Sequence, residues 1–108
     1  MKLWEAGFYI TEPEFVINPR ESGFVLLDFQ HLFGNSNPLV VEIGSGKGRF
    51  LIAGATEEPH RNFIGIEKSL HYHRVINERV SKRALRNVRL INHDAFPVLQ
   101  KMFPDMSC

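Results

Sequence analysis

Three short apolar runs, separated by longer segments, restrict the fold of this chain more than any other feature of its sequence. The runs are "LVVEI" (39–43), "NFIGIE" (62–67) and "NVRLIN" (87–92), and their residues are typical of buried strands. Strands this far apart in sequence pair in parallel through right-handed helical crossovers. The pattern therefore predicts an α/β fold, a partial doubly wound (Rossmann-like) parallel sheet with three strands present.

The segments between these strands have the apolar spacing of helices. Residues 46–58 lead from a glycine-rich turn into a helix that stops before Pro59. Residues 69–85 form a second helix, for which Ser69 is the expected N-cap. A third helix is predicted in "DAFPVLQKMF" (94–103).

The N-terminal third is expected to be an arm and a helix over residues 1–36, ahead of a sheet-forming part over 37–108. "FYITEPEFVI" (8–17) has strand-type residues interrupted by a proline and predicts an edge element, and "NPRESG" after it is typical of a turn. "FVLLDFQHLF" (24–33) has a broad apolar face followed by a glycine, which predicts a short helix.

Only one half of a doubly wound sheet is expected in this sequence, truncated after its third strand. The first strand of such a sheet is normally central, so here it would lie at an exposed edge. We expect the chain to be part of a larger domain, or that edge to be covered by self-association or by a partner chain.

The composition indicates one soluble globular domain, since 44% of the 108 residues are hydrophobic and 23% are charged. No apolar run approaches the roughly 20 residues that cross a membrane, and no signal peptide is recognisable. The single cysteine, Cys108, excludes an internal disulfide and a cysteine-based metal cage. A cytoplasmic location is expected.

Three glycines, Gly44, Gly46 and Gly48, follow the first strand at alternate positions. A dinucleotide fingerprint would need its third glycine where Arg49 stands. A P-loop would need a hydroxyl where Gly48 stands, and glycine in place of Val41. Neither phosphate-binding motif therefore fits this loop.

Three carboxylates follow or end the three strands and favour a different ligand. Glu42 lies two residues before the first glycine and suits an ammonium group or a loop amide. Glu67 ends the second strand, where an acid can accept hydrogen bonds from both ribose hydroxyls of a nucleoside. Asp94 follows the third strand and could meet the exocyclic amine of a purine. The carboxyl ends of parallel strands share one edge, so we predict a nucleoside-type cofactor site there.

The segments "PLVVEIGSGKGRFL", "NFIGIE" and "NVRLINHDA" resemble the tRNA (guanine-N7-)-methyltransferase family, within the class I S-adenosylmethionine-dependent methyltransferases. The resemblance covers about residues 32–103. It implies that 37–108 are the cofactor-binding half of a methyltransferase domain, that S-adenosyl-L-methionine is the cofactor and that tRNA is methylated at guanine N7. The cofactor-binding residues it implies are Glu42, Gly44, Ser45, Gly46, Gly48, Glu67, Lys68, Asp94 and Ala95.

The sequence departs from this family in one respect. The family has a further strand that ends in an aspartate-proline-tryptophan-proline motif, and this motif is absent before Cys108. Catalytic residues are therefore expected beyond Cys108, and turnover by this chain alone is not expected. Two alternatives remain open: a class I methyltransferase with another substrate, and a catalytically inactive, truncated binding or scaffold module.

Basic residues concentrate in residues 68–89, which carry a net charge of +6 while the rest of the chain carries −5. Such a run is either a solvated helix face, with an ordinary Glu78–Lys82 pair, or a surface for RNA phosphates. The candidate RNA-binding residues are Arg79, Lys82, Arg83 and Arg86, with Lys47 and Arg49 in the glycine loop. No metal site is predicted, because His71 and His73 do not share a helix face.

Overall fold

The computed structural model describes residues 16–103. Most of the expected edge element at 8–17, and Cys108, lie outside these residues. The described chain forms one parallel sheet in the order β1 (Leu39–Ile43), β2 (Asn62–Glu67), β3 (Val88–Asn92). Val41 is paired with Ile64, and Ile64 in turn with Arg89. The α/β fold and the parallel pairing predicted from the sequence are confirmed.

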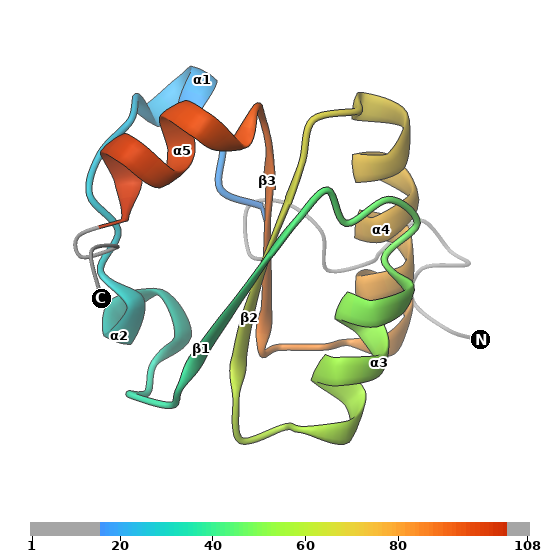
Figure 1. Cartoon of the computed structure of the whole chain (residues 1–108). Coiled ribbons are helices and arrows are strands. Elements are labelled where there is room, and N and C mark those ends of the chain that lie inside the picture. The colour runs from blue at the N-terminus through green and yellow to red at the C-terminus, as the bar shows by residue number, and fades with distance from the viewer. Residues whose placement is uncertain (1–15, 104–108) are drawn as a thin grey trace.

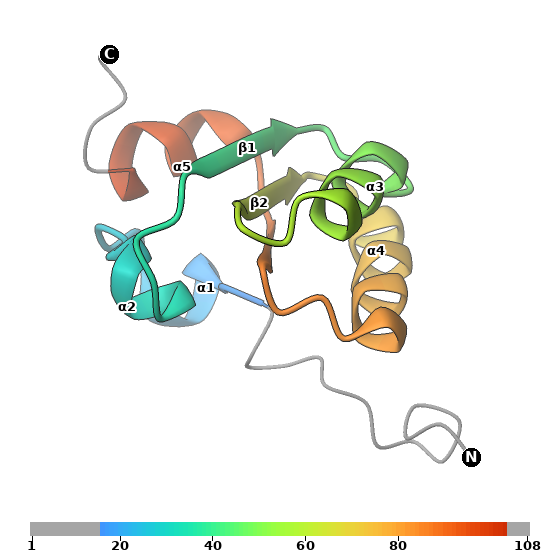
Figure 2. The ribbon, with the colours of Figure 1, turned by 90° about the horizontal axis from the view of Figure 1, so that it is seen from below.

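Helices cover both faces of the sheet. Figure 1 shows α3 (Arg49–Glu57) and α4 (Leu70–Arg83) on one side, and α1 (Pro19–Ser22), α2 (Phe29–Phe33) and α5 (Ala95–Met102) on the other. Figure 2, turned by 90°, shows the same division. No helix within residues 16–103 is long and apolar enough to cross a membrane.

Two hydrophobic cores result from this three-layer arrangement, because alternate residues of a strand face opposite sides. Phe63 packs with the helices α3 and α4, whereas Ile64 and Ile66 pack with α5. Every residue of β2 is buried, as expected for the middle strand of a covered parallel sheet. Gly65 lies between the two isoleucines, and an added Cβ there would come within 2.7 Å of Leu51.

The helix start predicted at Ser69 is confirmed. The Ser69 side chain accepts a hydrogen bond from the backbone N–H of Tyr72, which satisfies one of the unpaired donors of the first turn of α4. The helix ends at Arg83, with Ala84 in the left-handed region at φ +50°.

The helix predicted over 24–33 is wrong in its first half, since α2 contains only Phe29–Phe33. Asp28 caps α2 through a bond from the N–H of His31, which fixes the start of the helix there. Leu27 instead donates its N–H to the Met102 carbonyl. The turn expected at "NPRESG" contains the short helix α1, which Asn18 caps.

The first strand lies at one edge of the three-stranded sheet, as the sequence predicted. At the other edge, Val16 forms a parallel bridge with Leu90, and the N–H of Ile17 donates to the Leu90 carbonyl at 2.8 Å. The segment around residue 16 therefore extends the sheet beyond β3. The division of the chain at residues 36 and 37 stays a prediction.

Candidate functional site

The glycine loop between β1 and α3 turns sharply at the carboxyl edge of the sheet. Gly44, Gly46 and Gly48 all have positive φ values, between +56° and +80°, which other residues rarely adopt. An added Cβ would meet nothing within 4 Å at Gly44 or Gly46, whereas at Gly48 it would lie 3.0 Å from Ile76. The loop is thus packed against α4 at its end and has open space at its first two glycines.

Glu67 ties this loop to the end of β2. Its carboxylate accepts the backbone N–H of Gly46 on Oε1 and that of Ser69 on Oε2, each at 2.7 Å. The residue is only 8% exposed. This largely buried side chain, with a backbone donor on each oxygen, therefore fixes the glycine loop against the end of β2.

Glu42, near the end of β1, is half-buried. Burial raises the pKa of its carboxyl group above the ordinary value, and a side-chain hydrogen bond with Ser45 partly offsets this. Ser45 itself is buried at the start of the loop, with 6% exposure. Glu42 is therefore a carboxylate that a cationic ligand would stabilise.

Asp94 is the third carboxylate, and it is exposed. It occupies the N-cap position of α5, yet its side chain makes no capping hydrogen bond. The neighbouring Asn92 ties the edge together, because its amide nitrogen donates to the carbonyls of Glu67 at 2.9 Å and Lys68 at 3.1 Å. The three acids thus lie at the ends of neighbouring strands, and Asp94 keeps its carboxylate oxygens available.

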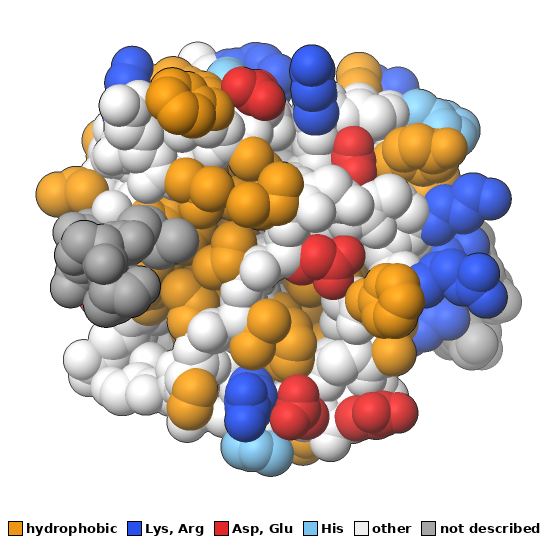
Figure 3. Space-filling view, viewed as in Figure 1, with side chains coloured by type: hydrophobic (Ala, Val, Ile, Leu, Met, Phe, Trp, Pro, Cys, Tyr) orange, Lys and Arg blue, Asp and Glu red, His pale blue; other side chains and the backbone are white. Residues whose placement is uncertain are grey.

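The residues suggested for cofactor binding follow this edge, while the RNA candidates divide into two groups. Lys47 and Arg49 are exposed at the glycine loop, and Arg83 and Arg86 are exposed at the far end of α4 and just after it. Lys82 forms the expected pair with Glu78, at 2.9 Å. Figure 3 shows Lys and Arg side chains gathered on the side where Figure 1 places α3 and α4.

Arg79 has a role that the sequence did not suggest. Its Nη1 donates to the carbonyl oxygen of Lys47 at 2.9 Å, so α4 holds the glycine loop directly. Arg79 lies one helical turn after Ile76, the residue that Gly48 approaches. No spacing in the sequence indicated this role, because the contact joins residues 32 apart.

The histidines of α4 differ in exposure, since His73 is buried and His71 is exposed. Within residues 16–103, no group of three or more His, Cys, Asp or Glu side chains is placed to hold a metal ion.

Comparison with known proteins places the chain among methyltransferases. A family model described as "Putative methyltransferase" matches residues 36–108. The tRNA (guanine-N(7)-)-methyltransferase of Psychromonas ingrahamii is 45% identical over 82 residues, or 76% of this chain and 34% of that protein. The protein of the same name from Hydrogenovibrio crunogenus is 42% identical over 82 residues, with the same shares. This chain therefore spans about a third of the length of the curated relatives it matches.

Among solved structures, the crystal structure of the glycopeptide N-methyltransferase MtfA complexed with sinefungin is similar over 78% of this chain and 37% of that one. The identity is 16% and the TM-score 0.46, a likeness too weak to bear on function. The resemblance to tRNA (guanine-N7-)-methyltransferases noted in the sequence is confirmed by the relatives above. The match over residues 36–108 shows that the chain belongs to the family described as "Putative methyltransferase".

Proposed function

We propose that this chain binds S-adenosylmethionine and is the cofactor-binding part of an enzyme that methylates guanine N7 in tRNA. One observation carries this proposal. Glu42, Glu67 and Asp94 lie at the same edge of the sheet, beside a glycine loop that has open space at its first two glycines. The names of the relatives supply the substrate. A cytoplasmic location also remains a prediction.

The donors and acceptors at this edge fit the cofactor. A carboxylate oxygen has two lone pairs, so each oxygen of Glu67 can accept a ribose hydroxyl besides its backbone N–H. Asp94, with no intramolecular capping bond, is available to an adenine amine beside Ala95. Glu42 can pair with the ammonium of the methionine end. Ser45, which precedes Gly46 in the loop, and Lys68, which follows Glu67, complete the proposed contacts.

The proposed reaction does not require an acid or a base from the protein. When bound, S-adenosylmethionine would supply a sulfonium methyl group to the lone pair of guanine N7, with an S–C bond exchanged for an N–C bond. No proton leaves N7, and no general base is needed. The residues of this chain would contribute by orienting the cofactor, and the glycine loop, fixed by hydrogen bonds, would serve that purpose.

The basic residues of the glycine loop and of α4 are proposed to contact tRNA phosphates. Lys47 and Arg49 lie at the glycine loop, close to the proposed cofactor site, and Lys82, Arg83 and Arg86 lie along and just after α4. Such contacts would position the RNA without reading its sequence. Arg79 is a weaker candidate for this role, because part of its guanidinium already holds the loop.

Calorimetric titration with S-adenosylhomocysteine tests the cofactor site. The most informative variant is Asp94→Asn, since this side chain makes no capping bond and its loss should leave folding intact. We expect binding to weaken about tenfold, the loss of a charge-assisted hydrogen bond. Glu57→Gln, which neutralises an exposed acid in the last turn of α3, is the matched control and should bind as the wild type does.

Two results would contradict the proposal. One is a folded wild-type chain that does not bind S-adenosylhomocysteine, and the other is unchanged affinity in Asp94→Asn. Methylation of unmodified tRNA is measured in a separate assay, in which transfer of a labelled methyl group to the RNA is the readout. Binding without transfer would identify the chain as a cofactor-binding module that needs further residues for turnover.

A further inference from the structure

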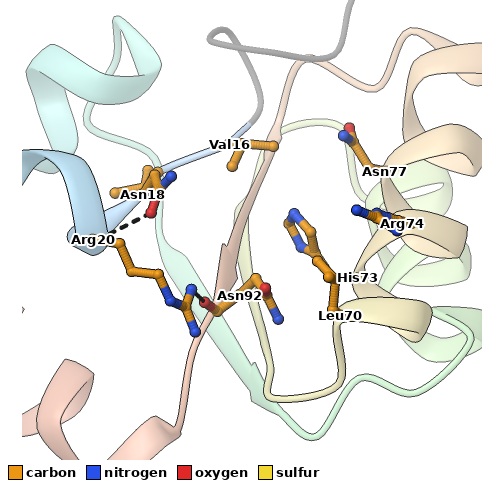
Figure 4. A pocket seen from close by; sticks show the side chains of 9 residues that line it. Val16, Asn18, Arg20, Leu70, His73, Arg74, Asn77 and Asn92 are labelled. Carbon is orange, nitrogen blue, oxygen red and sulfur yellow. Dashed lines mark hydrogen bonds between the residues drawn. The ribbon is translucent and has the colours of Figure 1, made fainter.

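A cavity of about 170 Å³ lies between α1 and α4, beyond the outer edge of β3. Figure 4 shows Arg20 on the α1 side facing His73, Arg74 and Asn77 of α4, with Asn92 between them. None of the three acids of the proposed cofactor site lines it. It is therefore a separate feature of the structure.

The cavity is positively charged. Two arginines from different elements line it, and no acid does so among the described residues. Arg20 donates to the backbone carbonyl of Asn92, and the side chain of Arg74 makes no hydrogen bond or ion pair with another residue of the described chain. Both arginines are exposed, and an anion bound between them would be attracted to both positive charges.

The phosphate contacts would fall to the two arginines. His73 is 6% exposed, and Asn77 and Asn92 also line the cavity, but the amide nitrogen of Asn92 already donates to the carbonyls of Glu67 and Lys68. Arginine forks match phosphate oxygens. The volume equals that of roughly six water molecules in the liquid, enough for a phosphate group but small for a whole nucleotide.

We propose that this cavity binds one phosphate group. The cavity shares the carboxyl edge of the sheet with the cofactor site, since Asn92 lies two residues before Asp94 and is bonded to the carbonyl of Glu67. A phosphodiester of the substrate RNA is the source we expect, which rests on the function proposed above. A free phosphate is the other source of the same chemistry.

Titration with inorganic phosphate, followed by ¹H–¹⁵N NMR, tests the cavity without cofactor or RNA. We expect saturable shifts of the side-chain amide signals of Asn77 and Asn92, against a sodium chloride control at the same ionic strength. Arg74→Gln should weaken this binding about tenfold, and because Arg74 holds no other described residue, the variant should fold. Arg61→Gln, just before the first residue of β2 and outside the cavity lining, is the control and should bind as the wild type does.

The dependence of tRNA binding on salt identifies the source of the phosphate. Loss of one phosphate contact should lower the slope of log affinity against log salt by about one in Arg74→Gln and leave it unchanged in Arg61→Gln. Phosphate binding with an unchanged slope would assign the cavity to free phosphate and overturn the RNA source.

Absence of saturable phosphate shifts, or equal shifts in Arg74→Gln, would overturn the proposal itself. The phosphate proposal and the cofactor proposal can be refuted separately. A chain that binds phosphate but no S-adenosylhomocysteine would refute the proposed methyltransferase function and leave the phosphate site standing.

Discussion

At the scale of single residues, Glu42 links the stability of the fold to pH. Its folded-state pKa is raised by burial, so the folded chain holds the proton more tightly than the unfolded chain does. As the pH rises from the ordinary value of 4.5 through the raised pKa, the free energy of unfolding therefore falls. At neutral pH the charged carboxylate is a modest cost to the apo protein.

We expect Glu42→Gln to be more stable than the wild type at pH 7, and to lose this advantage near pH 4. Urea unfolding at the two pH values measures the difference. An equal stability difference at both values would show that the Glu42 carboxyl is not perturbed by burial. The same substitution should weaken binding of S-adenosylhomocysteine, since it removes the proposed partner of the ammonium.

A second residue, Gly65, fixes how closely α3 approaches the sheet. In Gly65→Ala the new methyl would lie 2.7 Å from Leu51 Cδ2 and 2.9 Å from Ser45 Oγ, so we expect a loss of about 1–3 kcal/mol on urea unfolding. Gly54→Ala adds a methyl at the same interface, 3.0 Å from the Phe63 ring, but gains about 1 kcal/mol in helix propensity. A loss for Gly65→Ala no larger than that for Gly54→Ala would contradict this packing.

At the scale of elements, α4 supports the glycine loop through Arg79. Arg79→Met keeps the aliphatic stem but removes the donor to the Lys47 carbonyl. We expect binding of S-adenosylhomocysteine to weaken about tenfold and the backbone amides of the loop to exchange faster with solvent. Arg83→Met is the control, because within residues 16–103 the guanidinium of Arg83 bonds only the Arg79 carbonyl, at the exposed face of α4. Equal affinity in the two variants would show that the loop does not depend on Arg79.

Most elements were predictable because their signals are local. The strands at 39–43 and 62–67 were predicted with the bounds that they have. The third strand begins one residue later than predicted, at Val88. Asn87 instead directs its side-chain amide to the carbonyls of Ala55 and Arg61, at 3.1 and 3.0 Å, which closes the end of α3.

The contacts within the candidate site were not predictable in the same way. That the three acids follow strand ends is visible in the sequence, but the bond of Glu67 to Gly46 joins residues 21 apart and that of Arg79 to Lys47 joins residues 32 apart. Such pairs depend on how helices and loops meet in three dimensions. The cavity around Arg20 and Arg74 depends on the packing of α1 against the far edge of the sheet, and no sequence spacing indicated it.

At the scale of the whole molecule, β1 leaves one edge of the described sheet unpaired. Ile43 at its end is 56% exposed, and Phe50 just after the loop is 86% exposed. Figure 3 shows further hydrophobic side chains across the face where Figure 1 places α5 and β1. Unpaired strands with apolar surroundings pair readily with other chains.

We therefore expect the 108-residue chain to associate with itself at high concentration. Ile43→Lys places a charge on the edge strand and should shift the sedimentation profile toward monomer. Phe50→Lys removes a more exposed apolar side chain without altering β1 and serves as the contrast. A monomeric wild type would refute this expectation, and dissociation only in Phe50→Lys would assign the contact to α3 instead of the edge strand.

The two bonds that Glu67 receives have a consequence for the energetics of ligand capture. Fixing the backbone of a flexible residue costs about 1–2 kcal/mol in conformational entropy, and a loose glycine loop would incur that cost each time a ligand bound. Here Glu67 and Arg79 bond the backbone of the loop within the fold itself, so part of that cost falls on folding instead. The loop is therefore preorganised, and association with a ligand at this edge does not have to wait for it to become ordered.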